Sequence, residues 1–273
     1  MHNAAGNDSM HSFADRHIGP DDAQQQAMLE ALGAHTLDEL TDKIVPEQIK
    51  RDDHMQIDSG LSEHESLQRL QQMASKNVLK KSLIGLGFYN TYTPPVIQRN
   101  VLENPAWYTA YTPYQAEISQ GRMEAMLNFQ TMVTDLTGME LANASLLDEA
   151  SACAEAMTLC QRMAKNKSQV FFVDADCHPQ NIAVVKTRAS TLDIEVVVGD
   201  PLADMDELDV FAALVQYPGS SGEVRDFSAL AEALHQNRAL LAVSADLLAL
   251  TLLRSPAEFG ADVVVGNSQR FGV

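Results

Sequence analysis

The chain has few of the residues that build disulfide frameworks, metal cages or membrane spans. It contains three cysteines in 273 residues, an odd number without metal-ligand spacing, namely Cys153, Cys160 and Cys177. This pattern favours a reducing compartment, and no metal site is expected. No apolar run approaches the roughly 18 residues that a membrane helix needs. Residues 1–12 have neither the basic and apolar regions of a secretory signal nor the Arg-rich character of a transit peptide. A cytoplasmic protein without a membrane partner is predicted.

Basic residues are also scarce. The chain has 19 Lys and Arg against 37 Asp and Glu, which gives a formal net charge of −18. Such an acidic chain is repelled by nucleic acid and by anionic membrane surfaces, so neither is expected as a partner. Solubility alone is the simpler meaning of the charge. Hydrophobic residues make up 45% and charged residues 21%, which is ordinary for a soluble globular protein of one large domain or two small ones.

Composition and periodicity divide the chain into four regions. Residues 1–12 are small and polar and are predicted to be a disordered tail. Residues 13–80 show capping residues followed by apolar residues at helical spacing, which predicts a helical N-terminal region. Residues 81–118 are rich in Gly, Pro, Asn and aromatic residues and are predicted to form an ordered, extended crossing segment. Residues 119–273 alternate helical patterns with short apolar runs, which is typical of an α/β fold with a mainly parallel sheet.

Within the last region we predict individual elements from the hydrophobic spacing. Helices are expected at 120–137, 149–164, 180–190 and 227–236. Strands are expected at 170–173, 194–198, 210–216, 240–243 and 263–265, with a short apolar helix between the last two. The chain stops just after the last of these strands, at Phe271-Gly-Val273, so we expect this domain to be partial, cut at its C-terminus.

Polar aromatic residues crowd into one stretch, residues 108–122, which we call the tyrosine segment. It reads Tyr-Thr-Ala-Tyr-Thr-Pro-Tyr-Gln-Ala-Glu-Ile-Ser-Gln-Gly-Arg. Tyr and Gln are costly to bury without hydrogen-bond partners. The segment is therefore either a packed loop with satisfied hydroxyls or the wall of a small-molecule site.

Four predicted strands end in polar residues, and ligands of open α/β sheets bind beyond the carboxyl ends of the strands. The first exit, residues 174–179, carries His178, which either stacks on or hydrogen-bonds a ligand or is an ordinary helix-capping or loop histidine. The second, residues 217–222, either cradles an anion with backbone amides or is a plain turn. The third ends at Asp246, and the fourth is the polar loop 266–271.

Several long strings in the chain are highly specific and carry a resemblance. The chain is similar to the N-terminal half of the glycine cleavage system P-proteins, which are glycine dehydrogenases (decarboxylating). The resemblance runs from near residue 13 to the end and rests on Arg16-His-Ile-Gly-Pro20, Pro94-Pro-Val-Ile-Gln-Arg-Asn100, Glu103-Asn-Pro-Ala-Trp-Tyr-Thr-Ala-Tyr-Thr-Pro-Tyr-Gln115, Ala144-Ser-Leu-Leu-Asp-Glu149 and Ser268-Gln-Arg-Phe-Gly-Val273.

This resemblance implies a fold and a reaction. The fold is the large domain of fold-type I pyridoxal-phosphate (PLP) enzymes. The reaction is decarboxylation of glycine on PLP, with transfer of the aminomethyl group to the lipoyl arm of the H-protein. Family members are one long chain of two similar halves or two separate subunits, so a dimer or heterotetramer with a PLP-bearing half or second subunit is expected. The chain is then part of the enzyme or, alternatively, a non-catalytic partner subunit. An independent PLP enzyme is a weaker interpretation.

The half resembled here is the one that does not hold PLP covalently, and the residues agree. No lysine follows Lys186, and the resemblance places Gln269 where the catalytic half has its Schiff-base lysine. The strand end that should carry a carboxylate for the pyridinium nitrogen is Val243, with Asp246 three residues on. The helix start that should bind phosphate carries the acids Asp148 and Glu149 instead. We therefore predict no catalytic residue in this half and place PLP in the partner half.

The contribution of this half is then expected to come through a surface. We predict that Tyr111, Tyr114, Gln115 and Gln120 are pocket or interface contacts and that Arg122 binds a carboxylate or phosphate. Arg122 could instead pair with the acids of its own helix. His178, which matches a histidine of the PLP half, is a weak candidate for cofactor binding.

Overall fold

The computed structural model describes residues 13–17, 19–51, 53, 55–58, 60–85, 87–88, 90–108, 115–204 and 209–271. The chain divides into two compact units, residues 1–89 and residues 90–273, and each is described by itself. None of the described helices is both long enough and apolar enough to cross a membrane.

The first unit is helical, as the sequence predicts. Its helices are α1 (Phe13–His17), α2 (Asp22–Ala31), α3 (Leu37–Ile44) and α4 (Glu63–Ala74). The start of α4 is a complete capping box, because the Ser62 hydroxyl accepts from the Glu65 amide at 3.3 Å and Glu65 accepts from the Ser62 amide at 2.8 Å. At α3 the Thr36 hydroxyl accepts from the Glu39 amide, whereas the Glu39 carboxylate reaches past the cap to the amide of His35.

The helices of the first unit bury little. Among the described residues of this unit only Leu29 and Ala34 are buried. Large apolar side chains of α3 and α4 face outward, and Leu67 and Leu70 are 59% and 61% exposed. The helices are therefore set by their caps and local bonds, without a hydrophobic core of their own.

The second unit begins with two adjoining helical turns, α5 (Pro95–Ile97) and the π-helical η2 (Gln98–Leu102). They lie in a segment that the sequence predicts to be extended. The long helix α6 (Ala116–Thr137) starts four residues before the predicted position and ends, as predicted, at Gly138, which has a left-handed φ of 72°.

A five-stranded parallel sheet forms the centre of this unit, which confirms the predicted α/β class. Its strands are β1 (Val170–Asp174), β2 (Glu195–Gly199), β3 (Ala212–Tyr217), β4 (Leu240–Asp246) and β5 (Val263–Asn267), in the order β2-β1-β3-β4-β5. The interior strands read as continuous apolar runs because both of their faces are covered.

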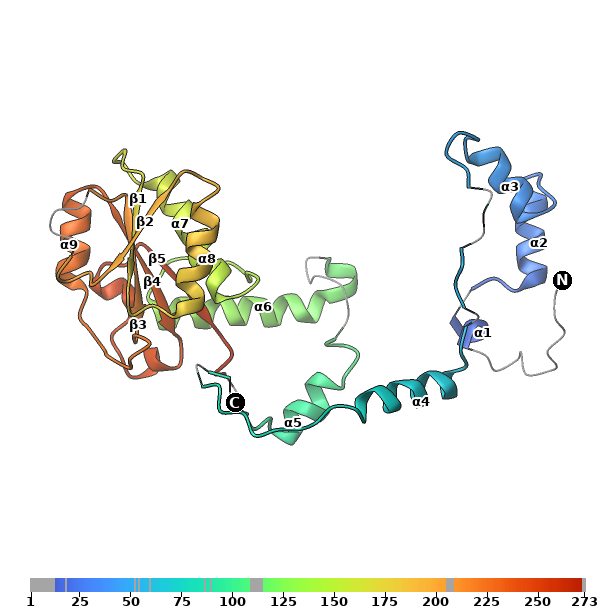
Figure 1. The fold of residues 1–273 in the computed structure, drawn as a ribbon, viewed down its shortest axis with the longest axis horizontal. Helices are drawn as coiled ribbons and strands as arrows, with labels where there is room; N and C mark the ends of the chain where they lie inside the picture. Colours follow the sequence, from blue (N-terminus) through green and yellow to red (C-terminus); the bar gives the residue numbers. More distant parts are fainter. Residues whose placement is uncertain are drawn as a thin grey trace. The chain divides into compact units, whose positions relative to one another are not determined.

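Helices cover both faces of the sheet (Figure 1). On one face α7 (Glu149–Met163) and α8 (Pro179–Ala189) pack on a core that includes Met157, Val185 and Phe171. On the other face α9 (Ser228–Gln236) packs with Phe227 and Phe259. The short helix predicted between β4 and β5 is a pair of 3-10 turns, η3 (Ala249–Thr251) and η4 (Pro256–Phe259). Because all five strands are parallel, their carboxyl ends lie along one edge of the sheet.

Candidate functional site

The candidate site is the carboxyl edge of the sheet, where the strand order reverses. The connection from β1 leads to β2 on one side, whereas β3 lies on the other side of β1 and leads on to β4 and β5. In open α/β sheets the crevice at such a reversal is where ligands bind. The side chains that follow β1 and β3 therefore decide what this edge can do.

The loops after β1 and β3 are bonded to each other. Asp176 accepts from the Ser221 amide at 2.9 Å and from the Ser221 hydroxyl at 2.8 Å, and its carbonyl accepts from the Ser220 amide at 2.8 Å. A Cβ at Gly219 would lie 1.7 Å from the Asp176 carboxylate, so only glycine fits there. Two amides of the predicted anion cradle thus already donate to Asp176, one to its carboxylate and one to its backbone carbonyl, which favours the plain-turn interpretation of residues 217–222.

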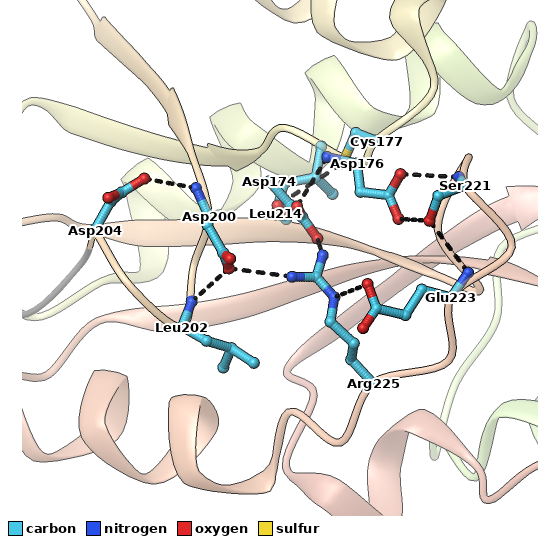
Figure 2. Close-up of polar contacts among 10 residues, drawn as sticks. All are labelled: Asp174, Asp176, Cys177, Asp200, Leu202, Asp204, Leu214, Ser221, Glu223 and Arg225. Atoms are coloured by element: carbon cyan, nitrogen blue, oxygen red, sulfur yellow. Dashed lines mark hydrogen bonds and ion pairs between the residues drawn. The ribbon is translucent and has the colours of Figure 1, made fainter.

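A buried arginine joins three strand exits (Figure 2). Arg225 donates to Asp174 after β1 at 2.5 Å and to Asp200 after β2 at 3.1 Å, and it lies 4.0 Å from Glu223. Its side chain is 12% exposed and that of Asp174 is 1% exposed. Burial acts to lower the pKa of Arg225, but the hydrogen bond and charge of Asp174 outweigh it and raise the pKa. This ion pair is fully satisfied and fixes the loops after β1, β2 and β3 relative to one another.

A second polar group, which we call the Glu149 cluster, consists of Glu149, His178, Asn181, Gln216 and Ser244. Glu149 accepts from the Asn181 amide group at 2.9 Å and from the Ser244 hydroxyl at 3.0 Å. Asn181 also donates to Gln216 at 3.3 Å. Asn181, Gln216 and Ser244 are buried, so each needs the partner it has. The Glu149 carboxylate thereby joins α7, α8 and β4, and Asn181 extends the cluster to β3.

His178 lies at the margin of this cluster. Its Nδ1 is 2.7 Å from the Ser220 hydroxyl, and its Nε2 is 4.0 Å from the Glu149 carboxylate. It is the N-cap residue of α8 but makes no side-chain capping bond. The imidazole connects the loop after β3 to the Glu149 cluster.

The N-terminus of α7 carries a second carboxylate. Asp148 is the N-cap and accepts from the Ser151 amide at 2.7 Å. This is an ordinary capping interaction, and it occupies an amide that a phosphate at this helix end would use.

The exits of β4 and β5 hold the remaining predicted residues. Asp246 forms an ion pair with Arg270 and accepts from the Leu248 amide at 3.1 Å. Gln269 is exposed, and its backbone amide donates to the side-chain oxygen of Asn267 at 2.7 Å. A Cβ at Gly266 would lie 2.3 Å from the carbonyl oxygen of Ala245, so glycine lets β5 approach β4. No lysine follows Lys186 of α8 in the sequence, so β4, β5 and the loops after them carry none.

The cysteines offer no reactive group. Cys153, Cys160 and Cys177 are free and buried. Burial raises the pKa of Cys153 and of Cys160 to about 12 and raises that of Cys177 still further. Thiols of this kind remain protonated and unreactive at neutral pH. Among the described residues there is also no group of three or more His, Cys, Asp or Glu that could hold a metal ion.

The predicted wall residues are placed only in part. Tyr111 and Tyr114 lie outside the described residues, as does the side chain of Gln120. Gln115 is exposed at the start of α6 and makes no capping bond, and Arg122 is half-buried in the second turn of the helix. Their predicted roles stay predictions.

Sequence reasoning did not find Arg225, Asn181 or Asp176. Their partners are far away in the chain, as with Arg225 and Asp174, which are 51 residues apart. One signal was available for the arginine, because Arg225 is the single Lys or Arg between Arg188 and Arg238 in an otherwise acidic stretch.

Comparisons with known proteins match this fold and this sequence. A family model described as the glycine cleavage system P-protein matches residues 15–273. The chain is 58% identical to a glycine dehydrogenase (decarboxylating) of Agrobacterium fabrum and 60% identical to one of Roseobacter denitrificans, in each case over 264 residues. Each match covers 96% of this chain but 28% of the relative.

A solved structure is similar along most of the chain. It is the crystal structure of a glycine decarboxylase (P-protein) of the glycine cleavage system in an inhibitor-bound form. The TM-score is 0.78 at 31% identity, and the match covers 93% of this chain and 59% of the other.

Proposed function

Because the chain belongs to the glycine cleavage system P-protein family, we propose that it is part of a glycine dehydrogenase (decarboxylating). Its fold is that of the PLP-transferase large domain, as the resemblance predicted. The proposed activity of the whole protein is decarboxylation of glycine on PLP, with transfer of the aminomethyl group to the lipoyl arm of the H-protein. The observation that carries this proposal is the high identity to glycine dehydrogenases along nearly the whole chain.

The residues of this chain do not fit a covalently held PLP. The position expected for the lysine is Gln269, whose amide cannot form an imine. The carboxylate for the pyridinium nitrogen is expected at Val243, and Asp246, three residues further along the chain, is already paired with Arg270. The helix start expected to bind phosphate carries Asp148 and Glu149. These features support placing PLP in the partner half, where it supplies the electron sink for the decarboxylation.

The part played by this chain is then to shape the site that its partner completes. The tyrosine segment is the proposed contact surface, with Tyr111, Tyr114, Gln115 and Gln120 as pocket or interface contacts. The guanidinium of Arg122 is proposed to bind a carboxylate or a phosphate, because its planar donors suit bidentate recognition of either group. The proposed partners are the PLP-bearing half, glycine and the lipoylated H-protein, in a dimer or heterotetramer.

One experiment tests both the activity and the division of labour. The whole polypeptide that carries residues 1–273, with its PLP-bearing partner if that is a separate subunit, should release labelled CO2 from carboxyl-labelled glycine when H-protein is present. Substitution Arg122→Ala should reduce this rate at least about tenfold, as expected for loss of a charged hydrogen bond to substrate or cofactor. The matched control Arg188→Ala removes an exposed arginine paired with Glu155 on α7 and should leave the rate unchanged.

Borohydride fixation followed by peptide mapping then locates the cofactor. The fixed PLP should lie on a lysine outside residues 1–273. A PLP adduct on any lysine within these residues would contradict the proposal and favour an independent PLP enzyme.

The second candidate is a non-catalytic partner subunit that only assembles and shapes the site. The absence of a suitable lysine favours it equally. The two are distinguished by whether the PLP-labelled lysine is on the same polypeptide as residues 1–273 or on a separate one.

A further inference from the structure

The polar groups along the carboxyl edge are satisfied by carboxylates and by one backbone carbonyl of the chain itself. The Ser220 and Ser221 amides donate to Asp176, Arg225 donates to Asp174, and Arg270 pairs with Asp246. Among the described residues no buried side-chain nitrogen or oxygen lacks a hydrogen-bond partner. At this edge, then, donors that could bind an anionic ligand are in use.

The helix that begins at the centre of this edge has two acids at its start. Asp148 accepts from the Ser151 amide, which uses one of the free donors of the first turn of α7. A capping residue alone would explain Asp148, because Asp is among the preferred N-caps.

Glu149 is not explained by capping. Its carboxylate turns away from the amides of its own helix and accepts from Asn181 on α8 and Ser244 on β4. Its side chain is 19% exposed, and both donors are almost fully buried. A partly buried carboxylate is costly unless it is bonded, so this residue is held here by the donors around it.

We propose that Asp148 and Glu149 together replace, from within the chain, the phosphate dianion that a PLP domain would hold at this helix N-terminus. Asp148 takes the helix amide, and Glu149 takes the donors from the neighbouring helix and strand. Together they carry two negative charges, about the charge of a phosphate monoester at neutral pH. The donors at this helix start are therefore bonded without a ligand, and the two negative charges repel an incoming phosphate. The identity of the replaced group as the phosphate of PLP rests on the proposed function. The occupation of the donors by Asp148 and Glu149 does not.

The test removes the carboxylates and offers an anion in their place. In the whole polypeptide, Glu149→Ala removes the carboxylate that accepts from the Ser244 hydroxyl and leaves the Asn181 amide group with only its longer bond to Gln216, which should lower the thermal midpoint by about 4–8 °C. Acetate added to this variant should restore part of the loss in a concentration-dependent manner. The double substitution Asp148→Ser with Glu149→Ala should gain more from inorganic phosphate than either the wild type or Glu149→Ala, because Ser keeps a cap while both charges are gone.

A matched control separates specific rescue from the general stabilisation that these salts give to any folded protein. Glu155→Ala removes an exposed acid of the same helix, paired with Arg188, and should show only the general effect of each anion. If the double variant does not fold, Glu149→Gln replaces it. The amide oxygen that this substitution introduces still accepts one bond, so the variant should lose less stability than Glu149→Ala and should not respond to acetate beyond the control.

Two results would overturn the inference. One is equal stabilisation of the wild type and the double variant by phosphate. The other is a response of Glu149→Ala to acetate no larger than that of Glu155→Ala. Because the readout is stability, rescue without any glycine decarboxylation by the whole protein would leave this inference standing and would count against the proposed function alone.

Discussion

At the scale of single residues, the three cysteines show how burial sets chemistry. The Cys160 thiol is fully buried, and burial raises its pKa from 9.0 to about 12. In the unfolded chain the same thiol ionises near pH 9, whereas the folded protein keeps it neutral until about pH 12. The unfolded state therefore loses its proton first, so the stability linked to this thiol is full below about pH 9 and falls as the pH rises from there toward 12.

This linkage gives a pH prediction. Between pH 9 and about 12 the free energy of unfolding should fall by up to about 1.4 kcal/mol per pH unit for Cys160. Urea unfolding at about pH 8 and about pH 10 should show a smaller pH-dependent loss for Cys160→Ala than for the wild type. Thr158→Ala, at a buried and non-titrating position of the same helix, should retain the wild-type pH dependence. An unchanged pH dependence in Cys160→Ala would contradict the pKa assigned to the buried thiol.

Residue roles could be predicted only where the signal is local. The acids at the start of α7 and the absence of any lysine after Lys186 are visible in the sequence, and in the structure Asp148 and Glu149 begin α7 while Gln269 follows β5. The partners of Glu149 could not be predicted, because Asn181 is 32 residues away and Ser244 is 95 residues away. Only the three-dimensional arrangement of α7, α8 and β4 brings them together.

At the scale of elements, termination of α6 depends on one glycine. Gly138 has a φ of 72°, and a Cβ added there would lie 2.8 Å from the Ser255 hydroxyl and 2.9 Å from the Ala257 methyl group. Gly222 also has a positive φ, of 89°, but a Cβ there would meet nothing within 4 Å. A residue with a Cβ would be strained by the left-handed backbone at either position, but only at position 138 would the Cβ also clash with neighbouring side chains.

Substitution by alanine should therefore lower the free energy of unfolding by different amounts at Gly138 and Gly222. Gly222→Ala should cost about 1–2 kcal/mol of unfolding free energy from left-handed strain alone. Gly138→Ala should cost about 2–4 kcal/mol, because overpacking against Ser255 and Ala257 adds to the strain. Urea unfolding of both variants measures the difference. Equal losses would mean that the loop containing Ser255 moves aside without penalty.

Most elements could be predicted from the sequence because their signals are local. A helix cap such as Ser62 or a continuous apolar strand such as β3 can be recognised from a few adjacent residues alone. The start of α6 lies four residues before the predicted one, because residues before 120 lack a helical apolar pattern. The helical turns at 95–102 were not predicted, because the surrounding region 81–118 is rich in Gly, Pro, Asn and aromatic residues, which disfavour a helix by propensity.

At the scale of the whole molecule, the two units differ in how much they bury. The second unit has cores on both faces of its sheet, whereas the described part of the first unit buries only Leu29 and Ala34. Stability in the first unit must therefore be low when residues 1–273 are alone.

Hydrogen exchange on the 273-residue chain tests this difference with two helices of similar length. The amides of α4 (12 residues) should exchange far faster than those of α9 (9 residues), because Leu230 and Leu234 of α9 are buried whereas Leu67 and Leu70 of α4 are exposed. Addition of the proposed PLP-bearing partner should slow exchange in α4 if its apolar side chains contact that partner. Protection of α4 equal to that of α9 in the chain alone would show that the first unit is stable by itself.

The position of β1 in the sheet has a consequence for synthesis. β1 pairs with β2 on one side and β3 on the other, and β3 is the last of these three strands to leave the ribosome. Until then one edge of β1, with its sequence Val-Phe-Phe-Val-Asp, has no partner strand. An apolar strand with an open edge can pair with another chain. The yield of soluble protein therefore depends on how quickly the ribosome completes residues 200–217, or on a chaperone that holds the nascent chain during that interval.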